Sequence, residues 1–239
     1  VPTADGKLRP DDVQGQCFDM EFVHRAQPGA VSITQSSELG TVYSPDEVSA
    51  LAEVAHANNL ALHMDGARLS NAAASLHVPV RAFTVDAGVD LVSFGLTKNG
   101  AMAAESVIVL NGDRVQGVDF LRKTSMQLAS KMRFLSAQFV AMLTDDLWLR
   151  SAGHANAMAS RLHDGVGDLS GVTITQSVDA NAVFVLLPEQ VASRLQERFH
   201  FYTWDQATGE VRWMCAWDTT ESDVDDFVAA VRGEIASGA

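Results

Sequence analysis

Cysteine is scarce in this chain of 239 residues, which contains only Cys17 and Cys215. The two lie far apart in the sequence and lack the short spacings that are typical of zinc sites. Two isolated cysteines in a chain of this length indicate reduced thiols rather than a disulfide framework. We therefore expect a cytoplasmic protein with no metal site at its cysteines.

Basic residues are also few, since 17 Lys and Arg stand against 30 Asp and Glu and the formal net charge is −13. A surface this acidic repels the phosphates of nucleic acids and of anionic membranes, so we expect neither as a partner. No apolar run approaches the roughly 20 residues that a membrane-spanning helix needs. Apolar residues make up 47% of the chain and charged residues 20%, which is typical of a globular protein.

Short apolar runs alternate with helical patterns in the first part of the chain. The stretch "SPDEVSALAEVAHANN" predicts a helix with Ser44 as its N-cap, Pro45 in its first turn and Glu47 closing a capping box. Strands are expected at residues 30–35, 60–65, 89–95 and 105–110. Strands that alternate with helices predict an α/β fold with a mostly parallel sheet and helices on both faces.

The second part of the chain has a different pattern. Residues 115–163 are helical in pattern almost throughout, which predicts a long connecting helix. Strand patterns follow in "NAVFVLL" and "EVRWMCAW", with a helix near 188–198 between them and a last helix from Glu221. We expect a large domain at residues 1–144, then the connecting helix and a small C-terminal α/β domain at 145–239.

Charged residues follow two of the expected strands. The stretch "HMDGAR" contains Asp65 and Arg68, and the stretch "GLTKNG" contains Lys98. Ligands of such sheets bind at the carboxyl ends of the strands. A Walker phosphate loop is excluded, because residue 97 is threonine rather than the required glycine. A single Lys or Asp at such a place is usually a surface or turn residue. Together, with glycines that let a ring approach the backbone, they suggest a carbonyl-reactive lysine and an anionic partner.

Two further basic features stand out in this acidic chain. One is the segment 122–133, which carries Arg122, Lys123, Lys131 and Arg133 and reads either as a solvated helix face or as a phosphate site. The other is Arg212, which strand alternation places opposite Val211 and Trp213. Burying a charge there is costly without a partner. Arg212 could pair with a carboxylate of the small domain or hold the carboxylate of a substrate.

Three stretches carry a resemblance to a known family: "SITQSSELGTVYSPDEV", "HMDGARLSNAAASL" and "DLVSFGLTKNGAMAAE". They resemble the low-specificity L-threonine aldolases, which are fold-type I pyridoxal-phosphate enzymes like the aromatic β-eliminating lyases. The resemblance implies that Lys98 forms a Schiff base with pyridoxal phosphate and that Asp65 pairs with the pyridinium nitrogen. It implies that Arg68 reaches the phenolic oxygen of the cofactor and the substrate carboxylate, which Arg212 also binds.

The same resemblance implies an assembly and an activity. Lys123 and Arg133 would reach the cofactor phosphate of a neighbouring subunit, in a homodimer or homotetramer. The activity would be retro-aldol cleavage of a small amino-acid substrate, L-threonine or L-allo-threonine, to glycine and an aldehyde. One alternative is a β-eliminating lyase that acts on an aromatic or sulfur amino acid. Another is a catalytically inert folded fragment.

One departure from the family concerns the start of the chain. The family has a segment ahead of the 31–36 strand that carries a Gly-rich phosphate-binding turn and an aromatic residue that stacks on the cofactor ring. This sequence begins after that point, so we expect a truncated chain whose cofactor site lacks one wall. The general base would then lie in the missing segment. His63 shares a strand face with Asp65, so it orients that carboxylate, touches the substrate or is simply packed. Gln35 and Glu38 lie near a strand end and either touch the ligand or serve the loop.

Overall fold

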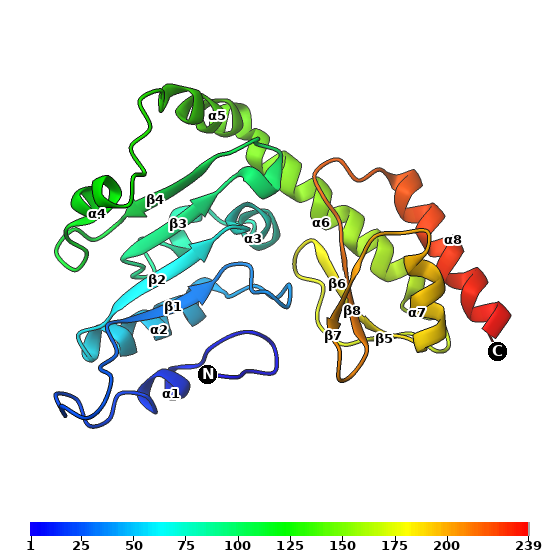
Figure 1. The fold of residues 1–239 in the computed structure, drawn as a ribbon, viewed down its shortest axis with the longest axis horizontal. Coiled ribbons are helices and arrows are strands. Elements are labelled where there is room, and N and C mark those ends of the chain that lie inside the picture. The colour runs from blue at the N-terminus through cyan, green and yellow to red at the C-terminus, as the bar shows by residue number, and fades with distance from the viewer. Residues whose placement is uncertain (239) are drawn as a thin grey trace.

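The structure, a computed structural model that describes residues 1–238, contains two sheets joined by a helix (Figure 1). The larger sheet has the order β1-β2-β3-β4. Its first three strands are parallel and the fourth is antiparallel to β3. The strands are β1 (Ala30–Thr34), β2 (Ala61–Gly66), β3 (Leu91–Gly95) and β4 (Glu105–Val109). The predicted fold class, a mostly parallel α/β sheet with a smaller C-terminal α/β unit, is confirmed.

Helix α2 (Pro45–Ala57) begins where the sequence predicts it. The Ser44 Oγ accepts a hydrogen bond from the Glu47 N–H at 3.2 Å, and the Glu47 carboxylate accepts one from the Ser44 N–H at 2.8 Å. This capping box satisfies two donors that the first turn of a helix otherwise leaves unpaired. The helix buries its apolar stripe against the sheet, at Val48, Leu51, Ala52 and Ala55.

The two faces of the larger sheet differ. One face is buried and contributes Ile33, Met64 and Phe94 to the core. The helices α2 and α3 (Leu69–Leu76) lie behind it in Figure 1. The opposite face of β1 to β3 is polar and only partly buried, with Ser32, Thr34, His63, Asp65 and Ser93. We call it the open face. The short elements on the larger sheet's side are α1 (Pro10–Gln14), η1 (Val80–Phe83) and η2 (Thr97–Asn99).

The region 115–163 is helical, but in several pieces. Helix α4 (Val118–Thr124) is followed by an irregular segment, then by α5 (Arg133–Leu143), η3 (Thr144–Asp146) and α6 (Leu147–Val166). The break before α6 occurs because Asp145 and Asp146 have left-handed φ angles of 51° and 54°. The long connecting helix is thus α6 alone, and the expected domain boundary at residue 144/145, which stays a prediction, lies just before it.

Helix α6 connects the larger sheet to the smaller one. Asn71 of α3 and Asn156 of α6 join the two helices by two hydrogen bonds. The Asn71 Nδ2 donates to the Asn156 Oδ1 at 3.0 Å, and the Asn156 Nδ2 donates to the Asn71 carbonyl at 2.9 Å. Phe94 of β3 also packs against Trp148 of α6. The position of the smaller sheet is therefore fixed by contacts that start in the larger one.

The smaller sheet is antiparallel and has the order β5-β6-β8-β7. Its inner face contributes Val183, Val211 and Trp213 to a second core. The elements are β5 (Thr173–Ile174), β6 (Ala182–Leu186), α7 (Glu189–Gln196), β7 (Tyr202–Asp205), β8 (Glu210–Met214) and α8 (Glu221–Gly238). Across residues 1–238, every helix is too short or too polar to cross a membrane.

Candidate active site

The carboxyl ends of β1, β2 and β3 meet the smaller sheet, and the predicted site residues gather there. The loop after β1 contacts the smaller sheet through Gly40, where an added methyl group would come within 3.3 Å of the Ala182 Cβ. The loop after β3 contacts it through Gly100, where a methyl group would come within 3.2 Å of the Trp217 ring. Asp65 and Arg68 lie at the carboxyl end of β2, Lys98 lies directly after β3, and Arg212 lies on β8; we use the word crevice for this junction between the two sheets.

Asp65 lies on the open face near the carboxyl end of β2, between Thr34 and Ser93 of the neighbouring strands. Its Oδ1 accepts a hydrogen bond from the Ala67 N–H at 3.0 Å, which fixes the turn that leads to Arg68. Within residues 1–238 the other carboxylate oxygen, Oδ2, accepts no hydrogen bond, so it remains available to a ligand.

Lys98 lies in the single turn η2 directly after β3. Both neighbouring residues are anchored: the Thr97 Oγ1 accepts from the Ala104 N–H at 3.1 Å, and the Asn99 Nδ2 donates to the Trp148 carbonyl at 2.8 Å. The Lys98 side chain itself is exposed. Within residues 1–238 it makes no hydrogen bond or ion pair that would occupy its amine. The turn therefore presents an unpaired amine from a backbone that is held on both sides.

Arg68 and Arg212 bring two positive charges to the same crevice. Burial lowers the pKa of the Arg68 guanidinium, and the nearby charge of Arg212 lowers it further. The carboxylates of Glu38 and Asp65 act in the opposite direction. Arg212 has no ion pair within residues 1–238, which disfavours the alternative that it pairs with a carboxylate of the small domain. Two neighbouring arginines are suited to bind a carboxylate.

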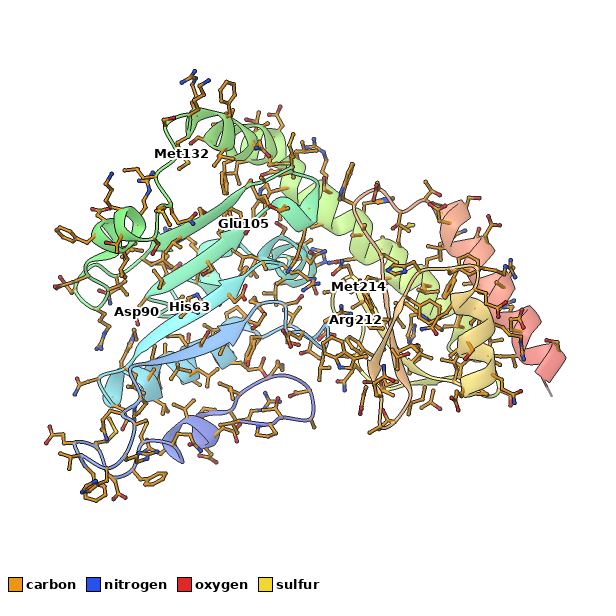
Figure 2. All side chains as sticks on the ribbon, in the orientation of Figure 1. His63, Asp90, Glu105, Met132, Arg212 and Met214 are labelled. Atoms are coloured by element: carbon orange, nitrogen blue, oxygen red, sulfur yellow. The ribbon has the colours of Figure 1, made fainter. Side chains whose placement is uncertain are left out.

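Figure 2 shows Arg212 and Met214 on the side of the smaller sheet that faces the carboxyl ends of β1 and β2. Val211 and Trp213 are buried on the opposite side, as the alternation of β8 predicts. The Nε of Arg212 is buried and has no hydrogen-bond acceptor among the described residues. Such an orphaned donor is costly unless something accepts from it, which again indicates an anionic ligand.

His63 shares the open face with Asp65. Its Nδ1 is hydrogen-bonded to the Ser32 Oγ at 2.8 Å and its Nε2 to the Ser93 Oγ at 2.9 Å. Because both ring nitrogens are bonded to serines and neither to Asp65, the geometry favours a packed histidine over one that orients the carboxylate. Gln35 is fully buried, and its amide group makes hydrogen bonds to the backbone of Tyr43 at both atoms, so it shapes the loop after β1. Glu38 in that loop is exposed.

The structure does not bring Lys123 and Arg133 to the crevice of their own chain. Strand β4 runs away from the crevice, so α4 lies at the end of the sheet where β3 begins (Figure 1). All four basic residues of the 122–133 segment are exposed. The basic segment 122–133 therefore lies apart from the junction that carries Asp65 of the same chain.

Two tryptophans at the crevice were not anticipated from the sequence. Trp217, in the loop after β8, packs on Gly100, and the ring of Trp204 on β7 lies under the Arg212 guanidinium. Three of the chain's four tryptophans fall between residues 204 and 217. That concentration of tryptophans in one short segment is the sequence feature that could have indicated their place at the site.

Comparison with known proteins gives a consistent set of similarities. Residues 1–190 match the sequence profile of the family described as "Beta-eliminating lyase". The low specificity L-threonine aldolases of a Pseudomonas species and of Pseudomonas aeruginosa are each 41% identical over 228 residues, which is 95% of this chain and 66% of theirs. The chain thus spans just under two thirds of the length of these relatives. The structure of Leishmania major threonine aldolase is similar with a TM-score of 0.90 and 27% identity, over 98% of this chain and 69% of that one.

Proposed function

Because the chain belongs to the β-eliminating lyase family, we propose that it is a pyridoxal-phosphate-dependent aldehyde-lyase. Its substrate class is β-hydroxy-α-amino acids, L-threonine or L-allo-threonine, which it cleaves to glycine and an aldehyde. The names of the 41% identical relatives support this activity. The observation that carries the proposal is the proximity of Arg68 to Arg212 and Asp65 at the junction of the two sheets, with the unpaired amine of Lys98 directly after the neighbouring strand β3.

The side chains of the crevice fit pyridoxal phosphate, on which enzymes of this family depend. Lys98 would bond to its carbonyl carbon, and Asp65 would accept a hydrogen bond from its protonated ring nitrogen. When bound, the cofactor supplies an electron sink for the bond that breaks. Fold-type I enzymes share this arrangement, and the similarity to Leishmania major threonine aldolase supports it.

Arg68 and Arg212 would hold the substrate carboxylate between them. Binding at that end fixes the substrate's rotation about its Cα, and hence the direction of the Cα–Cβ bond that is to break. Because Arg68 follows a strand of the larger sheet and Arg212 lies on the smaller one, both sheets would contribute to holding the substrate carboxylate. His63, held between Ser32 and Ser93, would keep the neighbouring part of the open face in place.

The proposal is tested by labelling and by product analysis. The protein is incubated with pyridoxal phosphate, reduced with borohydride and digested, and we expect the label at Lys98 and not at Lys131. Lys98→Ala is the control and should lose the label without losing its fold. Incubation with threonine should release acetaldehyde. A labelled protein that releases none would contradict the aldolase activity and leave the cofactor assignment standing.

Two alternatives have distinct outcomes in the same experiments. The family description favours a β-eliminating lyase as the second candidate, which would release pyruvate and ammonia from an aromatic or sulfur amino acid. The same lysine and aspartate serve both reactions, because the cofactor performs the difficult chemistry. No label on this chain, with strong label on a longer chain from the same gene, would support the inert fragment.

We further propose a homodimer or homotetramer in which Lys123 and Arg133 reach the cofactor phosphate of the partner. The location of α4, away from its own crevice, supports a role across an interface. Large apolar side chains are exposed beside these basic residues, with Phe120 at 79%, Phe134 at 61% and Val140 at 66%. An apolar surface of this kind is typical of a contact between subunits.

The assembly is tested with the double variant Lys123→Ala, Arg133→Ala. We expect weaker binding of pyridoxal phosphate while sedimentation still shows the dimer. Arg198→Ala, an exposed arginine of the smaller unit, is the matched control and should bind the cofactor normally. Unchanged cofactor affinity in the double variant would mean that these residues form only a solvated helix face.

The cytoplasmic location expected from Cys17 and Cys215, both free thiols in the structure, stays a prediction.

A further inference from the structure

Arg212 lies at the centre of the smaller sheet, with its guanidinium carbon 4.5 Å from the centre of the Trp204 ring. On either side, β8 pairs Arg212 with Phe184 of β6 and with Tyr202 of β7. The guanidinium thus lies on an aromatic surface and not against a carboxylate. An arginine over the face of an indole ring is attracted by the negative potential of the ring.

The Trp204 ring is itself held in place. It meets Phe184 edge to face, with the ring centres 5.5 Å apart and the planes at 84°. Phe184 is fully buried and is one of the largest completely enclosed side chains of the protein. Because Phe184 cannot move without disturbing the core, Trp204 offers Arg212 a surface with a fixed orientation.

Stacking uses the flat face of the guanidinium and leaves its edge free. The N–H groups of arginine lie in the guanidinium plane, so an arginine that stacks on a ring can still donate to a carboxylate. The orphaned Nε of Arg212 is one of these donors. The neighbouring charge of Arg68 repels Arg212, so a side chain this long would turn away if no surface held it.

We propose that Trp204 is the positioning residue for Arg212, and that its ring holds the guanidinium with its N–H edge directed at the α-carboxylate of the amino-acid substrate. The inference rests on the proposed function, in which Arg212 binds that carboxylate. It assigns to Trp204 a contribution to the binding of the carboxylate end only. The amine end, which belongs to Lys98 and the cofactor, is unaffected by it.

Two ligands that differ only in the carboxylate test the proposal. Glycine is a product of the proposed reaction, and methylamine is glycine without its carboxylate. Calorimetry on the pyridoxal-phosphate-loaded protein should show that Trp204→Leu raises the Kd of glycine by roughly threefold to tenfold, which is the range of a cation–π contact. The Kd of methylamine should stay within twofold. With threonine, the change should appear in KM rather than in kcat.

Tyr202→Leu is the matched control. Tyr202 lies on the same strand and pairs with Arg212, but its ring packs against His200 and not under the guanidinium. We expect it to bind glycine normally. An equal loss in Tyr202→Leu, or an equal loss of methylamine affinity in Trp204→Leu, would overturn the proposal, because the effect would then be a general disturbance of β7.

A second measurement covers the case in which Trp204→Leu does not fold. Fluorinated tryptophans weaken the negative potential of the ring with little change of size, so the Kd of glycine should rise stepwise with the number of fluorine atoms. In Trp204→Phe the fluorine effect should vanish. If the Kd of glycine does not change with the number of fluorine atoms, the proposal is wrong. The variant Arg212→Lys separates failure of the proposed function from failure of this inference. If Arg212→Lys binds glycine with normal affinity, Arg212 does not bind the carboxylate and the proposed function is wrong on this point. If Arg212→Lys loses affinity and Trp204→Leu does not, only the role of Trp204 is wrong.

Discussion

The indole ring of Trp217 lies against Gly100, two residues beyond Lys98. A methyl group added to Gly100 would come within 3.2 Å of the ring, and the φ angle of Gly100 is 108°, which residues with a side chain rarely adopt. The turn that carries Lys98 is therefore supported from the smaller sheet, whose loop after β8 supplies Trp217. The same loop follows the strand that supplies Arg212.

Gly100→Ala should disturb the lysine turn. The backbone strain costs roughly 1–3 kcal/mol of stability, and the added methyl group also displaces Trp217. We expect slower borohydride-trapped labelling of Lys98 as well as a lower free energy of unfolding. Gly117→Ala is the control, since Gly117 also has a positive φ, of 74°, but no atom within 4 Å of the added methyl group. Normal labelling in both variants would show that Trp217 does not support the turn.

Asp65→Asn should keep the fold and lose activity. An asparagine still accepts the hydrogen bond from the Ala67 N–H, so the turn survives, but it no longer favours a protonated ring nitrogen. We expect a loss of threonine cleavage of roughly 100-fold or more, as for other lost electrostatic contacts at a reacting centre, with Lys98 still labelled. Asp205→Asn is the control, because Asp205 accepts from the Ala207 N–H in the same way at the end of β7. Full activity in Asp65→Asn would contradict the role of this carboxylate.

Asp90→Ala should destabilise the larger sheet without touching the crevice. Asp90 is buried at the start of β3, where it accepts hydrogen bonds from the Leu62 N–H and the Asn111 Nδ2 and pairs with the His56 Nε2, each at 2.8 Å. Its loss leaves these partners unpaired, and the free energy of unfolding by urea should fall by roughly 3–5 kcal/mol. Asp86→Ala breaks an exposed pair with Arg81 and should change little. Equal stability of the two variants would contradict this account.

Alkaline pH should destabilise the protein through Tyr43. Burial raises the pKa of the Tyr43 hydroxyl from 10.0 to about 12. Because the folded protein binds this proton more tightly than the unfolded chain, the stabilisation is complete below pH 10 and is lost as the pH rises towards 12. The loss is roughly 2 kcal/mol. Urea unfolding at several pH values should show a shallower decline in Tyr43→Phe than in the wild type, and the same decline in Tyr202→Phe, whose ring is exposed.

The elements that the sequence predicted well are those set by neighbouring residues. The capping box of Ser44 and Glu47 and the alternation around Arg212 depend on spacings of two or three positions, so they could be read directly. The carboxyl-end location of Asp65 and Lys98 followed from strand order alone. Their roles remain predictions until the labelling and the substitutions are measured.

The features that escaped prediction depend on contacts between distant segments. The apolar pattern of β4 does not show that the strand is antiparallel to β3, because the alternation of side chains is the same for parallel and antiparallel strands. The breaks at residues 125–132 and at Asp145 lie in a sequence whose periodicity continues through them. The stack of Trp204 under Arg212 joins two strands, and the contact of Trp217 with Gly100 joins two sheets, so neither could be inferred from one stretch of sequence.

The proximity of Arg68 and Arg212 has a mechanical consequence. The two like charges belong to different sheets, and they repel each other across the junction of the two sheets. Dissolved salt screens this repulsion, so it is strongest at low ionic strength. A substrate carboxylate between the two guanidinium groups would bring one negative charge to two positive ones, so that each arginine is attracted to the ligand. Binding of the substrate would thus turn a repulsion between the two sheets into an attraction that both share.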